Sequence, residues 1–492
     1  MQDHILDVVI LGAGYGGLGM AAVLKQHNIH DFKIFEKAHS LGGVWRDNIY
    51  PGAACDTQSH IYCFSYFPHL RVSRMYAGQE ELLGYLQHLA THFQLHPHIQ
   101  YDAEIRKATW NQAEQLWILD ISGVGIVKTK VFIPAWGQLN TPVMPHFKGE
   151  ERFLGPRFHS AQWRYDVDLT DKKVISIGSA ASAVQYIPEV AKLAQQLTIF
   201  QLSANWIMPR DQYEFSKAEL DEFEQHPERF FASRNTIHQM REEGFNRTQH
   251  GSSMQQEGQR LALEHLHRHI QDPILREKLT PDYEFGCKRI LRTDDYYPTL
   301  NLAHVDLVTD SIAEITEHGI MTSAGEFIEA DVIIYGTGFA TQNFHGDLEI
   351  IGSRGESLSQ VWAQGAEAYL GISVPSFNNM FLVYGPNTNL NHNSIVTMLE
   401  IQHQYIAEAV QYILAHQVSL DVNLPLFRAY NEDVQRQMAS SAFSSDCSSW
   451  YKNAEGKVIN NWPLNVEAYR QATQFVANDY HEYQRHTHQE VV

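Results

Sequence analysis

Three glycines near the start of the chain have the spacing of a turn that binds a dinucleotide phosphate. Residues Val8–Gly17 read V-V-I-L-G-A-G-Y-G-G, so an apolar run leads into Gly12, Gly14 and Gly17. Gly12 allows a sharp turn, Gly14 lets a pyrophosphate approach the backbone, and Gly17 allows a helix to pack closely on the preceding strand. Because the start of such a helix presents free N–H groups and a partial positive charge, it favours a phosphate.

The elements needed to position this turn are also predicted. An apolar strand precedes the glycines, and the Ala-rich segment Leu18–Val23 suits a helix. A second strand, Phe32–Phe35, ends at Glu36, whose carboxylate is placed to accept hydrogen bonds from a ribose. Glycine-rich turns also occur in α/β proteins without a cofactor, but the strand, the helix and the acid together favour a dinucleotide site.

A second unit of the same kind begins at Lys172 and reads K-V-I-S-I-G-S-A-A-S-A-V-Q. Gly178 takes the first glycine position, and alanines take the other two. The methyl group of Ala180 stands where the backbone should meet a pyrophosphate, so the second turn is weaker than the first. The candidate contacts of a second dinucleotide lie in this turn and after the strand Leu197–Phe200, namely Gly178, Ser179, Ser182 and Ser203.

The two units predict an α/β fold with two Rossmann-like dinucleotide-binding domains, in which one dinucleotide delivers electrons to the other. We expect an FAD domain that is interrupted by an NAD(P) domain. Its first part is residues 1–142, the NAD(P) domain is 143–328 with a helical insertion at about 212–284, and 329–492 form the second part and the C-terminal tail. A late buried strand, Ala330–Tyr335, ends in a turn that carries Gly338 and Phe339 as candidate cofactor contacts.

Charge and hydropathy exclude several classes of partner. The chain has 492 residues and a formal net charge of −20, which argues against nucleic acid because phosphates repel such a surface. No run approaches the ~18 apolar residues of a membrane span. The first residues also lack the basic segment of a secretory signal, so we expect a cytoplasmic protein without a membrane span.

The cysteine and histidine content gives no reason to expect a metal. His265 and His269 share one face of a predicted helix but lack carboxylates at ligand spacing, so we expect a solvated helix face there. We expect neither a zinc site nor a redox disulfide, because no C-x-x-C pair occurs among the four cysteines, Cys55, Cys63, Cys287 and Cys447.

At this point the chain resembles the flavoprotein monooxygenases with two dinucleotide sites, which include Baeyer–Villiger and flavin-containing monooxygenases. The loop after Glu36 matches the pattern that separates the Baeyer–Villiger enzymes from the others, and it reads Gly42-Gly43-x-Trp45-x-x-x-x-Tyr50-Pro51-Gly52-x-x-x-Asp56. A segment just before the second glycine turn resembles the fingerprint of the group, and it reads Phe153-x-Gly155-x-x-x-His159-x-x-x-Trp163. It departs at Arg164, where the Baeyer–Villiger version carries Pro or Asp.

Two later segments extend the resemblance to nearly the whole chain. Lys288-Arg289, followed by Asp295-Tyr296-Tyr297, is similar to the segment that holds the active-site arginine of this family. The tail, with Trp450-Tyr451 and Trp462-Pro463, resembles the branch related to 4-hydroxyacetophenone monooxygenase.

The resemblance implies an FAD-dependent monooxygenase that uses NAD(P)H and molecular oxygen. It would insert one oxygen atom beside a ketone carbonyl, through a peroxide on the flavin, to give an ester or lactone. Arg289 would stabilise the developing oxyanion as a fixed cation, and Asp56 would hold it by a bidentate pair. The loop with Gly43, Trp45 and Tyr50 is either a wall around the bound ring system or a structural loop.

Other functions remain open from the sequence. Oxygenation of an amine nitrogen or a sulfide sulfur needs no cation for an alkoxide, and Arg164 leaves room for it. A flavin-dependent disulfide reductase is disfavoured by the absence of a cysteine pair near the flavin turn. A nucleotide-sensing scaffold would need degenerate sites, and only Ala180 and Leu202 point that way.

Leu202 bears on the choice between NADPH and NADH. Relatives carry Arg at this position, where it pairs with the 2′-phosphate of NADPH, so Leu202 removes a bidentate phosphate partner. Lys288 is the remaining candidate for that phosphate. We therefore predict a weaker NADPH preference than in typical relatives, with NADH as a possible donor.

Overall fold

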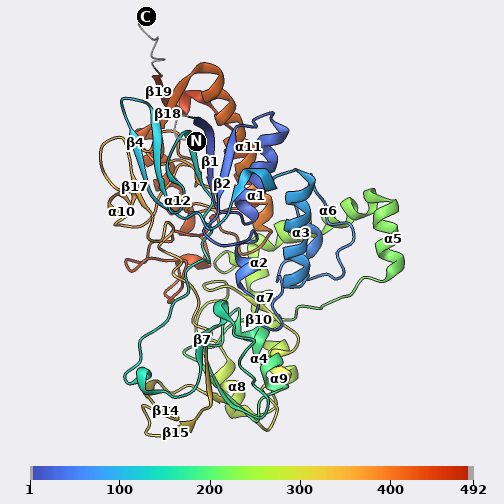
Figure 1. Ribbon diagram of the computed structural model, residues 1–492. Coiled ribbons are helices and arrows are strands. Elements are labelled where there is room, and N and C mark those ends of the chain that lie inside the picture. Colours follow the sequence, from blue (N-terminus) through green and yellow to red (C-terminus); the bar gives the residue numbers. More distant parts are fainter. Residues whose placement is uncertain (1–3, 486–492) are drawn as a thin grey trace, which may run out of the picture.

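The computed structural model describes residues 4–485, which form two α/β units and a helical arm. Figure 1 shows the first strands and the C-terminal helices together in the upper unit, the segment around β7 and β14 in the lower unit, and α5 and α6 at the side. None of the helices among residues 4–485 is both long enough and apolar enough to cross a membrane.

The upper unit is built on a seven-stranded sheet with the order β17-β4-β5-β6-β1-β2-β3. The central strands β6, β1, β2 and β3 are parallel, because the chain crosses over through a helix after β1. β4, β5 and β6 form an antiparallel meander. The bounds are β1 Ile5–Leu11, β2 Phe32–Phe35, β3 Ile99–Gln100, β4 Ile105–Asn111, β5 Leu116–Ile121, β6 Gly125–Pro134 and β17 Glu349–Ile351.

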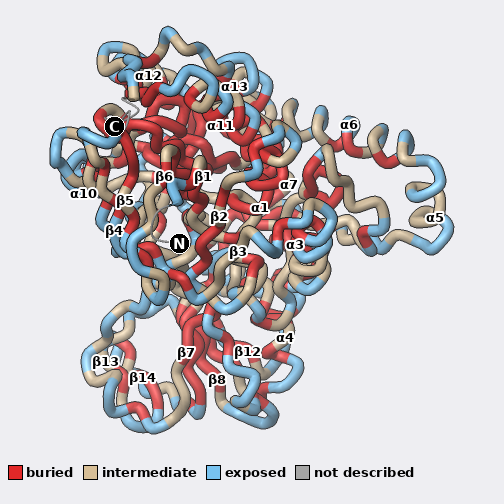
Figure 2. Tube along the Cα trace, turned by 45° about the horizontal axis from the view of Figure 1, so that its top comes forward, coloured by how far each residue is buried: buried red, intermediate tan, exposed pale blue. Residues whose placement is uncertain are grey.

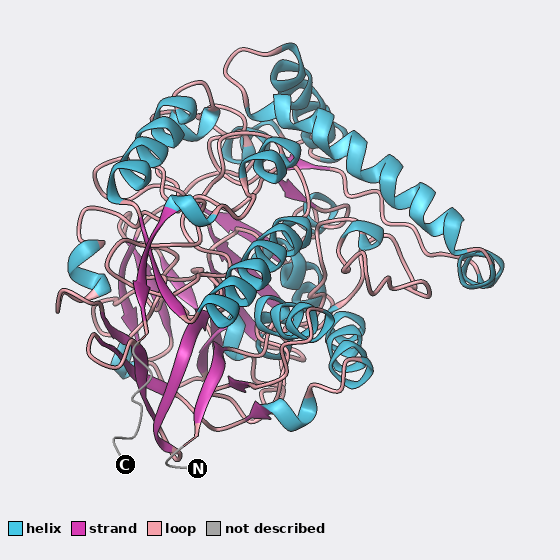
Figure 3. Ribbon diagram, turned by 90° about the horizontal axis from the view of Figure 1, so that it is seen from above, coloured by secondary structure: helices cyan, strands magenta, loops and turns pink. Residues whose placement is uncertain are grey.

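Helices cover this sheet and bury its apolar strands. Val8, Val9 and Ile10 of β1 have no exposed surface, and the red interior in Figure 2 marks the same region. The crossover helix α1 (Tyr15–Gln26) packs against α11 (Ile395–His416), whose first turn is capped by Ser394. Figure 3 shows helices on the outside of the strands. The remaining helices of this unit are α2 Val44–Asp47, α3 Gln79–His92, α10 Leu358–Val361, α12 Leu424–Met438 and α13 Val466–Ala472.

The lower unit holds a five-stranded parallel sheet with the order β12-β9-β8-β16-β7. Its strands are β7 Arg157–His159, β8 Lys173–Ile177, β9 Gln196–Phe200, β12 Val305–Val308 and β16 Val332–Tyr335. A small antiparallel sheet lies beside it and consists of β13 Ile312–Thr316, β14 Gly319–Thr322 and β15 Phe327–Glu329. The helices α4 (Ala183–Ala191) and α9 (Tyr296–Thr299) pack together next to these strands.

The strand Val332–Tyr335 corrects one expected boundary. We placed residues from 329 onward in the returning FAD domain, but β16 pairs with β7 and β8 of the lower sheet. The chain returns to the upper unit only after Tyr335. The apolar run Met380–Tyr384 is joined to the upper sheet by a single parallel bridge, between Phe132 and Met380.

The segment between β10 (Ile207–Met208) and β11 (Leu291–Arg292) carries the expected helices, α5 Lys217–Gln225, α6 Pro227–Glu243, α7 Ser253–His269 and α8 Pro273–Leu279. One detail of the prediction is wrong. His265 is only 5% exposed, and its ring lies 5.2 Å from that of Tyr297, so this helix face is packed rather than solvated.

The C-terminal tail is bound to both the upper unit and the insertion. β18 (Val418–Val422) and β19 (Tyr480–Gln484) pair as antiparallel strands. A disulfide joins Cys287, at the end of the insertion, to Cys447 in the tail. The cysteine spacing did not predict this disulfide, because two cysteines 160 residues apart are brought together by the fold and not by a local motif.

Candidate active site

The first glycine turn has the backbone geometry that a pyrophosphate needs. Gly12 has a φ of +95°, and a Cβ on Gly17 would lie 1.9 Å from the carbonyl oxygen of Gly12, so both positions require glycine. Gly14 faces Gly43, since a Cβ on Gly43 would lie 3.1 Å from the Cα of Gly14. Two backbones without side chains thus face one another at the start of α1, and this cradle fits a dinucleotide phosphate.

Glu36 lies at the carboxyl end of β2, as the ribose position requires. Its carboxylate accepts hydrogen bonds from the backbone N–H groups of Ala13 and Ala38, both at 2.9 Å. The guanidinium of Arg46 lies 3.2 Å from the same carboxylate. Glu36 is only 5% exposed, and these contacts hold its carboxylate in place beside the glycine turn.

The aromatic loop from Gly43 to Asp56 connects the two units. Tyr50 donates from its hydroxyl to Gln185 Oε1 at 2.9 Å, on helix α4 of the lower unit. Gly52 sits against the same helix, because a Cβ there would lie 2.5 Å from the carbonyl oxygen of Gln185. Trp45 donates to the hydroxyl of Tyr62 at 3.3 Å within the upper unit. Tyr50 is thus a contact between the units, and Trp45 packs near the first glycine turn.

The second turn is also formed, with its candidate residues at the ends of the lower strands. Gly178 has a φ of +110°, and a Cβ there would meet the carbonyl oxygen of Gly336 at 2.4 Å. Ser182 is the N-cap residue of α4, but its side chain accepts no hydrogen bond from the backbone N–H groups of the helix. Lys288 Nζ lies 2.9 Å from Ser203 Oγ, beyond the end of β9. The turn and this cation form a second cradle that fits a dinucleotide with phosphate groups. Ser179 also lies in this turn, where its backbone carbonyl accepts a hydrogen bond from Asn205.

Arg289 and Asp56 are brought together between the units. Arg289 Nη2 donates to Asp56 Oδ1 at 2.7 Å and to Oδ2 at 2.6 Å, and Nε donates to Oδ2 at 3.1 Å. The side chains keep 33% and 24% of their surface accessible, so the pair is reachable by a ligand.

The electrostatics keep both members of this pair ionised. The charge of Asp56 raises the pKa of Arg289, against the effect of burial. Burial acts to raise the pKa of Asp56, but the charge and hydrogen bonds of Arg289, with the charges of Arg241 and Arg292, lower it overall. A permanently charged guanidinium held at two points is suited to stabilise an oxyanion.

Two tyrosines that sequence reasoning missed also face Arg289. Tyr384 and Tyr451 both interact electrostatically with its guanidinium. Tyr384 has a φ of +61°, an uncommon conformation for a bulky residue that marks a constrained position. Its hydroxyl donates to Asn389 Oδ1 at 2.8 Å. The sequence signal for Tyr384 was the turn Gly385-Pro386-Asn387 after an apolar run, and that for Tyr451 was the Trp450-Tyr451 pair of the tail.

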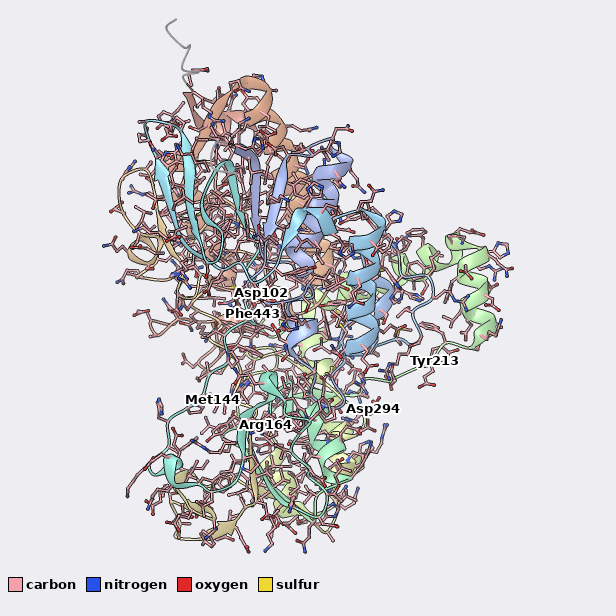
Figure 4. The ribbon with its side chains drawn as sticks, viewed as in Figure 1. Asp102, Met144, Arg164, Tyr213, Asp294 and Phe443 are labelled. Atoms are coloured by element: carbon pink, nitrogen blue, oxygen red, sulfur yellow. A yellow bond between two sulfur atoms is a disulfide. The ribbon has the colours of Figure 1, made fainter. Side chains whose placement is uncertain are left out.

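The fingerprint segment and the turn with Gly338 lie where the chain crosses between the units. The N–H of Val143 donates to the carbonyl oxygen of Gly338 at 2.9 Å, so the two crossings are joined. The ring of His159 lies 5.7 Å from that of Phe339. Burial lowers the pKa of His159, which favours the neutral ring. Figure 4 shows Met144 on one crossing and Arg164 at the upper end of the lower unit. The fingerprint residue His159 thus lies beside the segment by which the chain returns to the upper unit.

Comparison with known proteins identifies the class. The model of the flavin-binding monooxygenase-like family matches residues 6–221. A Baeyer–Villiger monooxygenase of Pseudomonas aeruginosa is 38% identical over 96% of this chain and 91% of its own length. One of Streptomyces coelicolor is 36% identical over 98% and 93%.

Solved structures agree over the full length. A steroid monooxygenase bound to NADP superposes with a TM-score of 0.86 at 28% identity, covering 98% of this chain and all of that one. OTEMO in complex with FAD and NADP superposes with the same TM-score at 26% identity, covering 97% and 99%.

The family match and the superposed structures show the fold of a flavin-dependent monooxygenase. The chain belongs to the Baeyer–Villiger monooxygenases. It uses FAD and NADPH and carries out Baeyer–Villiger oxygenation, in which one oxygen atom is inserted beside a carbonyl carbon.

Proposed function

We propose that Arg289 and Asp56 are the catalytic pair that converts a ketone to an ester or lactone in this enzyme. The observation that supports this most is the two-point contact between them, at 2.6 and 2.7 Å through Nη2, in a partly accessible position between the two cradles. Attack on a carbonyl carbon places negative charge on its oxygen, and a guanidinium fixed in advance lowers the free energy of that state.

We propose that the upper cradle holds FAD. The residues that would hold it lie on β1, β2, the aromatic loop and the later crossing, and are Gly12, Gly14, Gly17, Glu36, Gly43, Trp45, Gly338 and Phe339. When bound, FAD supplies the redox chemistry that accepts a hydride and activates oxygen. Glu36 orients a ribose by accepting hydrogen bonds, and the glycines admit the pyrophosphate to the backbone.

We propose that the lower cradle holds NADPH. The residues that would hold it are Tyr50, Asp56, Gly178, Ser179, Ser182, Ser203 and Lys288. Lys288 lies beside Ser203 and over the ring of Tyr283 at 4.4 Å, which restrains its ammonium group where a phosphate would be neutralised. In this proposal residues 4–142 and 336–485 form the FAD domain, and 143–335 the NADPH domain with its helical insertion.

We propose a ketone as the substrate, in preference to an amine or a sulfide. A cation paired at two points is needed for an oxyanion but not for oxygenation of nitrogen or sulfur, and this chain has such a cation in Arg289. The test is a probe that carries both an aryl ketone and a thioether, incubated with NADPH and isotopically labelled oxygen. An ester with one labelled atom supports the proposal, and a labelled sulfoxide as the sole product contradicts it.

We also propose the cytoplasm as the place of this reaction, because NADPH is supplied there. The Cys287–Cys447 disulfide is unusual for a reducing compartment. Cell fractionation with trapping of thiols at lysis tests both points, and recovery of the enzyme outside the cytoplasm contradicts the proposal.

A further inference from the structure

One side chain on helix α4, Gln185, contacts the end of the aromatic loop. Its Oε1 accepts hydrogen bonds from the hydroxyl of Tyr50 at 2.9 Å and from the backbone N–H of Ala54 at 3.4 Å. Its Nε2 donates to the backbone carbonyl oxygen of Ala54 at 3.0 Å. The side-chain amide thus contacts both backbone groups of Ala54, which lies two residues before Asp56 in the chain.

The backbone pairing of the upper unit explains why Ala54 turns to the lower unit. The two neighbours of Ala54 bond to residues 77–79 of the upper unit, through the N–H of Cys55 and the carbonyl oxygen of Ala53, each at 2.9 Å. Successive residues of an antiparallel pair direct their backbone groups to opposite sides, so those of Ala54 face away from this pairing. Gln185 meets them with one acceptor and one donor, as a neighbouring strand would.

Helix α4 gives Gln185 a fixed position close to the second glycine turn. Gln185 is the third residue of this helix, and its neighbours Val184 and Ile187 are buried in the core of the lower unit. Figure 1 shows α4 near the upper end of the lower unit. Gly52 lets the loop come close to the helix, since a Cβ there would lie 2.5 Å from the backbone carbonyl oxygen of Gln185. The end of the loop therefore rests on a well-packed element of the other unit.

The hydroxyl of Tyr50 adds a third hydrogen bond to this contact. Burial raises the pKa of Tyr50 to about 12, so its hydroxyl stays protonated near neutral pH and can donate. Its ring also lies 6.0 Å from that of Tyr186, the residue after Gln185. Loss of the amide of Gln185 would therefore remove the partner of the Tyr50 hydroxyl and of both backbone groups of Ala54 at once.

We propose that Gln185 is a positioning residue for the catalytic pair, because it holds the segment before Asp56 against the lower unit. The inference rests on the proposed function, in which Asp56 fixes the guanidinium of Arg289 through hydrogen bonds of 2.6 to 3.1 Å. Two residues of extended chain span at most about 7 Å, so a displacement of Ala54 also displaces Asp56. Hydrogen bonds weaken steeply as their geometry departs from the optimum, and a misplacement of about 1 Å can lower a rate about 100-fold.

A general contact between the two units is the alternative role for Gln185, and Tyr165 allows the two roles to be separated. The hydroxyl of Tyr165, in the lower unit, donates to the carbonyl oxygen of Ile49 at 2.6 Å. Ile49 belongs to the same loop but precedes the segment that Gln185 contacts. Tyr165→Phe therefore removes a hydrogen bond between the units without removing a partner of Ala54, and it is the matched control.

Hydrogen exchange on the FAD-loaded enzyme, without nicotinamide or substrate, tests whether Gln185 holds the loop. The readout is the mass of a peptide that covers residues 51–56. We expect the amide of Ala54 to exchange about tenfold faster in Gln185→Met than in the wild type, because its hydrogen-bond acceptor is lost. Tyr165→Phe should exchange as the wild type does in this peptide.

The yield of ester tests whether the held loop positions the catalytic pair. The probe is 4-(methylthio)acetophenone, which carries an aryl ketone and a thioether, and the readout is ester formed per NADPH oxidised. We expect this ratio to fall about tenfold in Gln185→Met, with hydrogen peroxide making up the difference. FAD content, the KM for NADPH and the rate of flavin reduction should stay close to the wild-type values, a split that a merely structural role would not give. Tyr165→Phe should keep the wild-type ratio.

Each other outcome overturns the inference. Wild-type exchange in Gln185→Met would show that the amide does not hold the loop, and faster exchange with a wild-type ester yield would show that the loop does not position the pair. Loss of FAD, or an equal loss of ester in Tyr165→Phe, would indicate a general structural contact. Asp56→Asn is measured in parallel. If it keeps the wild-type yield, or if the wild type forms no ester, the proposed function fails and the inference with it, whereas failure of the inference alone leaves Asp56→Asn impaired.

Discussion

Arg289 and Asp56 meet through two guanidinium nitrogens and both carboxylate oxygens, although 233 residues separate them in the chain. Asp56 follows the aromatic loop of the upper unit, and Arg289 follows the helical insertion of the lower one. The pair therefore forms only when both units fold and come together.

Replacing the cation separates catalysis from cofactor binding. We expect Arg289→Ala to fold, to retain FAD and to accept electrons from NADPH, while ester formation falls by about 10²–10³. The oxygen consumed would then be released as hydrogen peroxide, which a coupled peroxidase assay measures against NADPH oxidation. Arg289→Lys keeps a charge but loses the two-point contact, so it should recover only part of the activity. Loss of FAD or of folding in Arg289→Ala would indicate a structural ion pair instead.

Replacing the carboxylate has a predictable pH dependence. The folded-state pKa of Asp56 is lowered, since the surrounding guanidiniums outweigh burial. Its contribution to stability is therefore complete above the unfolded pKa of about 3.9 and is lost as the pH falls through the lower folded value. We expect the difference in Tm between wild type and Asp56→Asn to stay constant from about pH 8 to pH 5 and to shrink below about pH 4. A difference that disappears between pH 8 and pH 5 contradicts this assignment.

We expect the exposed leucine after β9, Leu202, to weaken the preference for NADPH over NADH. Leu202 is 99% exposed and makes no packing contribution that a larger side chain would disturb. We expect the ratio of kcat/KM for NADPH over NADH to lie below a hundredfold in the wild type and to rise about tenfold in Leu202→Arg. Leu202→Ala is the uncharged control and should leave the ratio unchanged. Steady-state kinetics with both nucleotides measure it, and a wild-type ratio above a hundredfold would show that Leu202 does not weaken the preference.

The contact of Gly43 with Gly14 tests the upper cradle. Gly43 has a φ of +53°, and a Cβ there would lie 3.1 Å from the Cα of Gly14. Gly125 also has a positive φ, of +95°, but has open space around it. Both substitutions by alanine strain the backbone by about 1 kcal/mol. Only Gly43→Ala should also lose FAD, with roughly tenfold lower occupancy at limiting FAD. The ratio of absorbance at 450 nm to that at 280 nm measures the FAD content. Equal FAD content in the two variants would place the flavin elsewhere.

The disulfide between Cys287 and Cys447 ties the segment of Arg289 to the tail. Denatured, unreduced protein should therefore show only the two thiols of Cys55 and Cys63, and reduced protein four. We expect Cys447→Ser to lower the free energy of unfolding by about 2–4 kcal/mol. Four reactive thiols in the unreduced protein would contradict the disulfide.

Local signals predicted the parts of the fold that depend on local chemistry. Glycine spacing located both cradles, because only glycine tolerates the φ of Gly12 and Gly178 and the close backbone contacts there. The helices of the insertion were also predicted, since composition acts within a few residues.

Contacts between distant segments could not be read from the sequence. The strand Val332–Tyr335 has the same apolar character in either sheet, so its partner depended on the rest of the fold. The same holds for the approach of Cys447 to Cys287 and of Tyr384 and Tyr451 to Arg289.

The most direct test of the catalytic pair compares wild-type enzyme with Arg289→Ala, both loaded with FAD, under labelled oxygen with NADPH and one ketone probe. Mass spectrometry follows the label, and flavin reduction is recorded in the same reaction. Our account predicts an ester with one labelled atom from the wild type, and labelled hydrogen peroxide with almost no ester from the variant at a similar rate of flavin reduction. Ester formation by Arg289→Ala within a few-fold of the wild type would contradict it.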